Sequence, residues 1–245
     1  MKKMFNILFI VLLAGTHFQI MAQTFQWANR AGSAGIEESA YSTDIDASGN
    51  IYTVGRFNDT TDFDPGPGIY HLIPSGANDI FVSKSDASGN FIWAKKMGGP
   101  AMDQGYSISL DAAGNSYITG YFELTADFDP GPGVYNLTSV GSMDIFVAKL
   151  DTAGNFEWAV SMGASGIDKG YSVSADAAGN VYATGYFVGT VDFDPSAGTY
   201  NLTAADYDGF ISKLDPSGNL LWAKQINSNS YLYSFSVDID GAGNV

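Results

Sequence analysis

The sequence repeats with a period of about 65 residues, and this repeat restricts the possible folds more than any other feature. A D-x-x-G-N turn places its glycine at Gly49, Gly114, Gly179 and Gly243. A second series of the same turn has its glycine at Gly89, Gly154 and Gly218. A D-F-D-P motif with the same period begins at Asp62, Asp127 and Asp192. Three markers that share one period indicate tandem copies of one structural unit.

Each copy is predicted to contain four strands, because each turn lies between two stretches of strand-forming residues. In the middle copy these stretches are 106–111, 116–122, 144–150 and 156–162. Aspartate can accept hydrogen bonds from the turn backbone, and glycine can take the left-handed conformation that closes a short hairpin. The turn aspartates are therefore interpreted as turn formers: Asp46, Asp86, Asp111, Asp151, Asp176 and Asp215.

These units are predicted to be blades of an all-β protein, a β-propeller of four-stranded antiparallel blades. The chain contains 29 glycines, 14 tyrosines and 16 phenylalanines, which favours strands and tight turns over helices. In the middle copy the first strand contains the small Ser107 and Ser109, whereas the fourth contains Trp158. Bulk that increases across a sheet suits blades that are crowded at an axis and splayed at the rim. A β-sandwich is the alternative, but it does not explain the fixed period.

The blades are expected at about residues 41–98, 106–163 and 171–227, within a propeller domain of residues 23–245. Residues 25–32 match the fourth strand of a repeat, and a partial fourth blade is expected from residue 233, with Ser234–Asp240 as its first strand. About three full blades plus parts form an incomplete ring, because an arc of this size cannot close. The chain is therefore expected to be a fragment of a longer protein.

The strings DASGNIYTVGRF, DAAGNSYITGYF and DAAGNVYATGYF are each followed by a D-F-D-P loop and a strand such as DIFVAKLD. This combination resembles the bacterial secreted β-propeller repeat (SBBP) family, and the resemblance covers residues 25–245. The resemblance implies a β-propeller in an extracellular repeat protein. It implies no particular reaction, because the activities of such proteins are mostly unassigned.

The amino terminus has the features of a secretory signal peptide, residues 1–22. Lys2 and Lys3 precede an apolar run from Phe5 to Ala14, and cleavage is expected after Ala22. This run is shorter than the roughly 20 residues that span a bilayer, so no membrane span is expected after signal removal. The protein is therefore expected to be secreted or to lie at the cell surface. It contains no cysteine, so no disulfide stabilises it.

The formal net charge of −15 argues against nucleic acid as a partner, because an anionic polymer would be repelled. Cations, neutral glycans and basic proteins stay possible, and an extracellular glycan or protein is the expected partner. The regular tyrosine and tryptophan series could offer a surface for stacking sugars, although its regularity favours packing in the core. Arg56 is an exception to this regularity, because the other copies have Tyr121 and Tyr186 at that position.

The D-F-D-P loops are the best candidates for a site. Asp62 and Asp64 are expected on one side of an extended stretch, with Phe63 on the other, and Pro65 favours that conformation. Paired carboxylates suit Ca²⁺, which binds about six to eight oxygens. The alternative is that these carboxylates accept backbone N–H groups while the phenylalanine enters the core. The predicted metal ligands are Asp62, Asp64, Asp127, Asp129, Asp192 and Asp194.

No enzyme chemistry is expected from these residues. His71 is the only histidine after the signal peptide, and the other copies have Asn136 and Asn201 at its position. A Ser-His-Asp triad needs an imidazole base, so His71 is a poor candidate for one. Paired-carboxylate hydrolysis stays possible, but the aspartates follow the repeat where a catalytic site should break it. The expected function is a non-catalytic scaffold for binding or adhesion. The alternatives are the propeller part of a polysaccharide-active enzyme with catalytic residues elsewhere, and a structural spacer.

Overall fold

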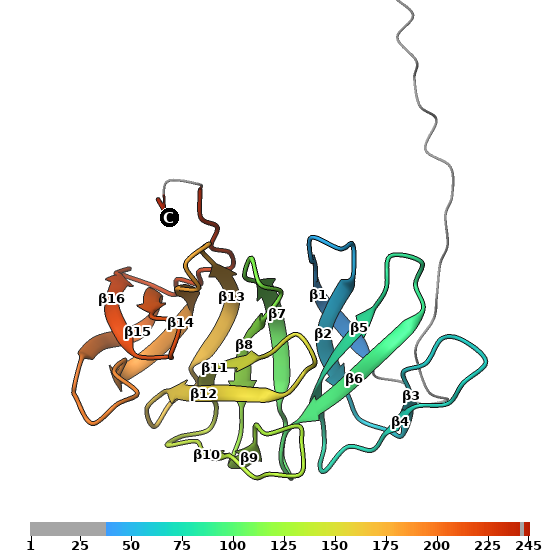
Figure 1. The fold of residues 1–245 in the computed structure, drawn as a ribbon. Helices are drawn as coiled ribbons and strands as arrows, with labels where there is room; N and C mark the ends of the chain where they lie inside the picture. Colours follow the sequence, from blue (N-terminus) through green and yellow to red (C-terminus); the bar gives the residue numbers. More distant parts are fainter. Residues whose placement is uncertain (1–37, 241–242) are drawn as a thin grey trace, which may run out of the picture.

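The computed structural model describes residues 38–240 and 243–245, and these residues form strands, turns and loops (Figure 1). Twelve longer strands form three four-stranded sheets. Blade 1 contains β1 (Ser39–Ile45), β2 (Ile51–Phe57), β5 (Asp79–Ser85) and β6 (Phe91–Met97). Blade 2 contains β7 (Gln104–Leu110), β8 (Ser116–Phe122), β11 (Asp144–Leu150) and β12 (Phe156–Met162). Blade 3 contains β13 (Lys169–Ala175), β14 (Val181–Asp192), β15 (Asn201–Leu214) and β16 (Leu220–Ile226).

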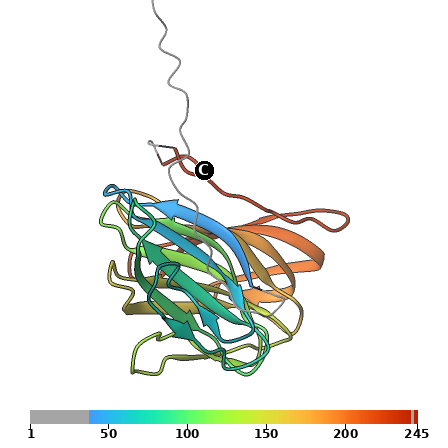
Figure 2. The ribbon, with the colours of Figure 1, turned by 90° about the vertical axis from the view of Figure 1, so that its right-hand side faces the viewer.

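Within each blade the strands are antiparallel and lie side by side in chain order. The first strands β1, β7 and β13 contact one another in turn, and the later strands spread away from them (Figure 1). From the side, blade 1 lies in front of the other two (Figure 2). This arrangement is that of neighbouring propeller blades, so the predicted all-β, propeller-like fold of four-stranded antiparallel blades is confirmed. None of the described residues forms a helix that could cross a membrane.

Serine side chains join the inner strands of neighbouring blades. The backbone N–H of Val173 on β13 donates to Ser107 Oγ on β7 at 3.2 Å. The N–H of Ala175 donates to Ser109 Oγ at 3.1 Å. Ile108 uses Ser42 Oγ of blade 1 in the same way, at 3.4 Å. An inner strand is the edge of its sheet, and these serines supply acceptors for N–H groups that no strand pairs.

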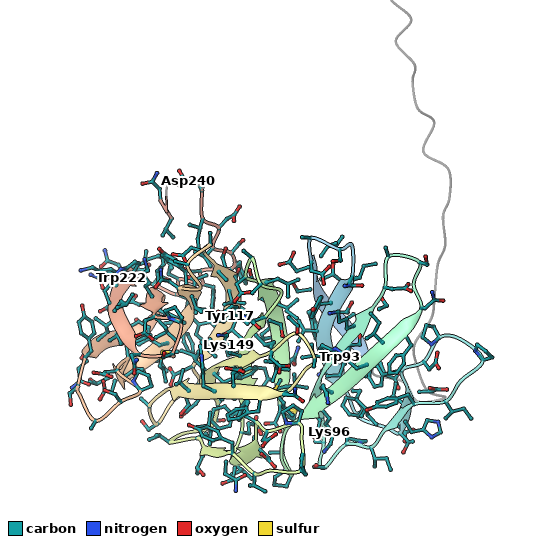
Figure 3. The ribbon with its side chains drawn as sticks, in the orientation of Figure 1. Trp93, Lys96, Tyr117, Lys149, Trp222 and Asp240 are labelled. Atoms are coloured by element: carbon teal, nitrogen blue, oxygen red, sulfur yellow. The ribbon has the colours of Figure 1, made fainter. Side chains whose placement is uncertain are left out.

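Tyrosine and tryptophan side chains fix each blade to the turns of the next one. The hydroxyl of Tyr117 donates to the carbonyl of Gly179 at 3.3 Å, and Trp158 Nε1 donates to the carbonyl of Pro216 at 3.0 Å. Tyr52 and Trp93 repeat both contacts one blade earlier. Lys149 covers the Tyr117 ring, with its Nζ 5.5 Å from the centroid (Figure 3). These aromatic residues therefore pack between blades.

The D-x-x-G-N turns have the geometry that their sequence predicts. In the second turn of blade 2, Asp151 Oδ1 accepts the N–H groups of Ala153 and Asn155, both at 2.8 Å. Asp151 Oδ2 accepts Asn155 Nδ2, and Gly154 has a φ of 76°. The other five predicted turn aspartates make the same hydrogen bonds. These bonds lower the pKa of the turn aspartates, although partial burial opposes the shift.

The connection between the second and third strands forms a small hairpin that the strand pattern does not predict. In blade 1 it contains β3 (Thr61–Asp62) and β4 (His71–Leu72), and in blade 2 it contains β9 (Thr125–Asp127) and β10 (Asn136–Thr138). In blade 3 it continues β14 and β15, which are correspondingly longer. Gly98 after β6 exchanges two backbone hydrogen bonds with Asp127, so this hairpin also holds the preceding blade.

Residues 227–240 contain no assigned strand, although a first strand was expected at Ser234–Asp240. The segment still follows β13, because the N–H of Val237 donates to Ser172 Oγ at 3.2 Å. This contact repeats the serine link between the complete blades. The predicted signal peptide, residues 1–22, and the predicted strand at 25–32 lie outside the described residues.

We expect Ser107→Ala to lower the free energy of unfolding by about 1–3 kcal/mol, because the buried Val173 N–H would lose its acceptor. Urea unfolding of the purified chain measures this loss. Ser165→Ala, at an exposed loop position, is the matched control and should change stability by less than about 0.5 kcal/mol. Equal effects of the two substitutions would contradict a structural role for the inner serines.

Candidate functional site

The D-F-D-P carboxylates accept backbone hydrogen bonds from their own loop. In blade 2, Asp127 Oδ1 accepts the N–H of Asp129 at 3.0 Å and that of Tyr135 at 2.8 Å. Asp129 Oδ1 accepts the N–H of Gly131 at 2.8 Å. The same pattern holds the other two loops through Asp62, Asp64, Asp192 and Asp194. In blade 1, the backbone amides of Tyr70 and Asp64 lower the pKa of Asp62.

The loop is also packed tightly around these aspartates. A Cβ atom at Gly133 would lie 2.1 Å from Asp129 Oδ2, so a larger residue there would displace the Asp129 carboxylate. The central Phe128 is fully buried between Phe122 and Phe146, with ring centroids 5.4 and 4.9 Å away. The capping role and the buried phenylalanine, which were the alternative to metal binding, are therefore both present in the structure.

Calcium at the six D-F-D-P aspartates stays a prediction. Each loop offers two carboxylates, and their Oδ1 atoms already accept backbone N–H groups. Among residues 38–240 and 243–245, no group of three or more His, Cys, Asp or Glu could hold a metal ion. A calcium ion here would therefore need most of its oxygens from backbone carbonyls or water.

A row of aromatic side chains crosses the inner strands of successive blades. Its members are Tyr41 on β1, Tyr106 on β7, Tyr171 on β13 and Phe235 in the segment that follows β13. Successive ring centroids are 5.3, 5.2 and 5.1 Å apart. We call this row the aromatic ladder. Tyr106 and Tyr171 are half-buried, and Tyr41 is exposed. The ladder lies at the end of the strands that carries the D-F-D-P connections, opposite the D-x-x-G-N turns.

Each tyrosine of the ladder occupies a β-bulge. The pairing of β7 with β8 shifts between Gly105 and Ser107, so Tyr106 has no partner, and Tyr41 and Tyr171 sit at the same irregularity. A bulge inserts an extra residue and can re-aim its side chain. A Cβ at Gly105 would lie 2.5 Å from Val54 Cγ2 of the preceding blade. In blades 2 and 3 the bulge at the Gly-Tyr-Ser sequence therefore positions the tyrosine ring. The glycine of this sequence lets the preceding blade approach closely.

A second group of side chains supports the ladder from the second strands. The Tyr121 ring is buried, its centroid lies 5.9 Å from that of Tyr106, and its hydroxyl donates to Gln104 Oε1 at 3.1 Å. Tyr186 supports Tyr171 in the same way, at 5.5 Å. Burial raises the pKa of Tyr106 and of Tyr186, so their hydroxyls stay protonated in neutral solution.

Two cations flank the middle of the ladder. Lys169 Nζ lies 4.2 Å from the centroid of the Tyr121 ring. Burial lowers the pKa of Lys169, and the negative charge of Glu123 opposes that shift. Arg56, from blade 1, is half-buried and acts electrostatically on both Tyr106 and Tyr121. The ladder therefore combines apolar rings, hydroxyl donors and positive charge.

Buried carboxylates connect the blades beside the ladder. Asp103, between blades 1 and 2, accepts the N–H of Gly99 at 2.6 Å and that of Glu123 at 3.2 Å. Burial raises its pKa to about 7, and the nearby charges of Asp79 and Glu123 add to the shift. Asp168 has the corresponding position one blade later, and burial raises its pKa to about 6. These carboxylates order the turn between blades.

The ladder tyrosines and the core tyrosines recur with the same period, so periodicity does not distinguish them. Tyr52, Tyr117 and Tyr182 on the second strands are buried, as the regular recurrence of the series predicts. Tyr106 and Tyr171 recur with the same period, yet they are only half-buried. The available signal was the glycine before and the serine after each of them, which together mark a bulged inner strand rather than a regular one.

No protein-family model matches the chain. It is 28% identical over 228 residues to the uncharacterized WD repeat-containing protein L264 of Acanthamoeba polyphaga mimivirus, covering 80% of this chain and 16% of that protein. It is 24% identical over 148 residues to the regulatory protein FlaEY of Caulobacter vibrioides, covering 59% of this chain and 15% of that protein. The chain thus spans about one sixth of the length of each relative. The structure and the WD-repeat relative agree on a propeller-like repeat protein.

We expect the stability of the protein to rise as pH falls from about 8 to about 5. The pKa values of Asp103 and Asp168 are raised in the folded state, so between the ordinary aspartate pKa and about 7 the folded chain binds more protons than the unfolded chain. Below about pH 4 the trend reverses, because the turn aspartates have lowered pKa values and lose their stabilising charge. Urea midpoints at pH 8, 5 and 3 measure both trends.

Asp103→Asn should reduce the gain between pH 8 and pH 5 by on the order of 2 kcal/mol. Asp168→Asn serves the same purpose if the first variant does not fold. The control is Asp206→Asn, which removes an exposed charge and should leave the gain unchanged. If Asp206→Asn reduced the stability gain as much as Asp103→Asn does, the trend would be due to net charge instead.

Asp127→Ala should lower the free energy of unfolding by about 1–2 kcal/mol, because two backbone N–H groups lose their acceptor. Thermal or urea unfolding measures the loss, and the exposed Asn136→Ala on β10 is the control. No difference between these two variants would contradict the capping role.

The calcium prediction for the same loops has its own measurement. Thermal unfolding with millimolar Ca²⁺ and with EDTA should give midpoints several degrees apart if calcium binds the folded loops, because a ligand of the native state raises Tm. Equal midpoints would leave only the capping role for the six aspartates.

Proposed function

We propose that the protein is a secreted, non-catalytic β-propeller scaffold of the SBBP type that binds an extracellular glycan or protein. The observation that carries this proposal is the aromatic ladder. Tyr106 and Tyr171 are held 5.2 Å apart on rigid inner strands, and their rings are only partly covered. The remaining features of the repeat serve the contacts between and within blades.

The chemistry of the ladder supports a binding role. Tyrosine offers a flat apolar face together with a polar hydroxyl, and both sugars and protein side chains pack on such faces. The bulges and the supporting Tyr121 and Tyr186 fix the rings before a ligand arrives. A rigid surface loses little conformational entropy on binding, which favours affinity.

The distribution of acidic residues supports a non-catalytic scaffold. Backbone N–H groups donate to the turn aspartates, to the D-F-D-P aspartates and to the buried Asp103 and Asp168. These hydrogen bonds stabilise the fold. His71 lies exposed on β4 at the edge of a D-F-D-P hairpin.

The proposed secretion is supported by the sequence of residues 1–22.

We expect the purified chain to be retained by at least one member of a defined panel: cellulose, chitin, polygalacturonate and immobilised collagen. Tyr106→Ala should weaken that retention by about tenfold or more, because removing a central aromatic contact typically costs this much. Tyr135→Ala, on the outer D-F-D-P hairpin, is the control and should bind like the original chain. Equal loss in both variants, or retention that Tyr106→Ala does not change, would place the ligand elsewhere.

A further inference from the structure

The two positively charged residues beside the ladder differ from the residues at the equivalent positions of the other repeats. Arg56 stands where the other blades have Tyr121 and Tyr186. Lys169 stands where the earlier blades have Ser39 and Gln104, as the pairing of each residue with the second strand shows. Residues that follow the repeat serve the blades, so two cations that depart from it at one place indicate a role specific to that place.

Lys169 lacks the aspartate partner of three other strand lysines, and like Lys149 it lies over a tyrosine ring. Lys84, Lys96 and Lys213 have aspartate oxygens at 3.7, 3.0 and 3.9 Å. Within the described part of the chain, no carboxylate oxygen lies within 4.0 Å of the Lys169 ammonium. Its ammonium lies over the face of the Tyr121 ring. A half-buried ammonium of this kind gains strongly from an added anion, because low polarity strengthens the attraction.

The rings beside these cations indicate the chemistry of the uncharged part of the ligand. Tyr106 belongs to blade 2, whereas Arg56 belongs to blade 1 and Lys169 to blade 3. The Tyr106 ring contacts those of Tyr41 and Tyr171. Its hydroxyl is protonated in neutral solution, as tyrosine hydroxyls ordinarily are, and burial raises its pKa further. Apolar ring faces, hydroxyl groups and a cation together match a sugar ring that carries a carboxylate.

We infer that the ladder binds an acidic polysaccharide, with hexuronate rings packed against Tyr106 and Tyr171 and their carboxylates paired with Lys169 and Arg56. This inference rests on the proposed function and specifies its ligand class. The chain as a whole is acidic, with a formal net charge of −15, so long-range repulsion opposes the approach of such a polymer. Physiological salt screens that repulsion beyond about 8 Å while leaving direct contacts in place.

The test compares two forms of one polymer, polygalacturonate and its fully methyl-esterified form, at 0.15 M NaCl by affinity electrophoresis or calorimetry. The two polymers share the sugar backbone and differ only in the carboxylate charge. We expect polygalacturonate to bind the original chain about tenfold or more tightly than the ester does, because charge-assisted hydrogen bonds to the carboxylate are lost in the ester.

Two variants restore the residues of the sibling repeats and should therefore fold. Lys169→Gln introduces the residue found at Gln104, and Arg56→Tyr introduces the one found at Tyr121. Each should reduce polygalacturonate binding by about fivefold or more and leave binding of the ester unchanged. Lys224→Gln, which removes an exposed charge from β16, is the control and should keep the preference.

The remaining outcomes separate this inference from the proposed function. Equal binding of both polymers, weakened by Tyr106→Ala, would overturn the acidic ligand and support the scaffold. Binding of polyglutamate alone would overturn the glycan and identify an acidic protein as the partner. If none of these polymers binds, the acidic-glycan inference is wrong, and the panel of cellulose, chitin and collagen decides the proposed function separately.

Discussion

The structure depends on how the inner strand of each blade satisfies its free edge. Such a strand pairs on one side only, and its outward N–H groups would otherwise lack partners close to the axis, where the blades meet. Ser107 and Ser109 supply those acceptors to the next blade, and Ser42 and Ser172 supply them at the neighbouring junctions. At the junction of blades 1 and 2, Asp44 Oδ2 takes the place of a second serine and accepts the N–H of Leu110 at 2.8 Å. One repeat therefore completes the hydrogen bonding of the next.

The outer parts of the blades meet by different contacts. Tyr117 and Trp158 extend from one blade to the carbonyls of two turns in the next, and both turns are kept in shape by aspartate and glycine. The same aspartates thus stabilise their own hairpin and present it to a neighbour. The turn aspartates therefore account for part of the high aspartate content through contacts within and between blades. The ladder is the place where partly exposed rings and unrepeated charges coincide.

The blade pattern could be predicted from the sequence because every blade repeats the same local rules. The predicted strands at 116–122, 144–150 and 156–162 agree with β8, β11 and β12. The first strand begins earlier than expected, at Gln104, because the bulge at Tyr106 interrupts the alternation on which the prediction rests. The small hairpins were missed because strands as short as β9 carry no recognisable period.

The candidate site was less predictable for a physical reason. Periodicity shows that a residue is structurally equivalent in each copy, but it does not show how much of its side chain the neighbouring blade covers. Tyr117 and Tyr106 are therefore alike in sequence terms, although one is buried and the other half-buried. Arg56 was visible as an exception, whereas the role of Lys169 needed the positions of Tyr121 and the surrounding acids.

Amide hydrogen exchange of the folded chain tests most directly whether neighbouring blades complete each other's inner edges. We expect the outward amides of Val173 and Ala175 on β13 to exchange as slowly as amides inside the sheets, with their opening requiring global unfolding. Exchange of these two amides at the rate of an exposed strand edge would show that the blades do not depend on one another in this way.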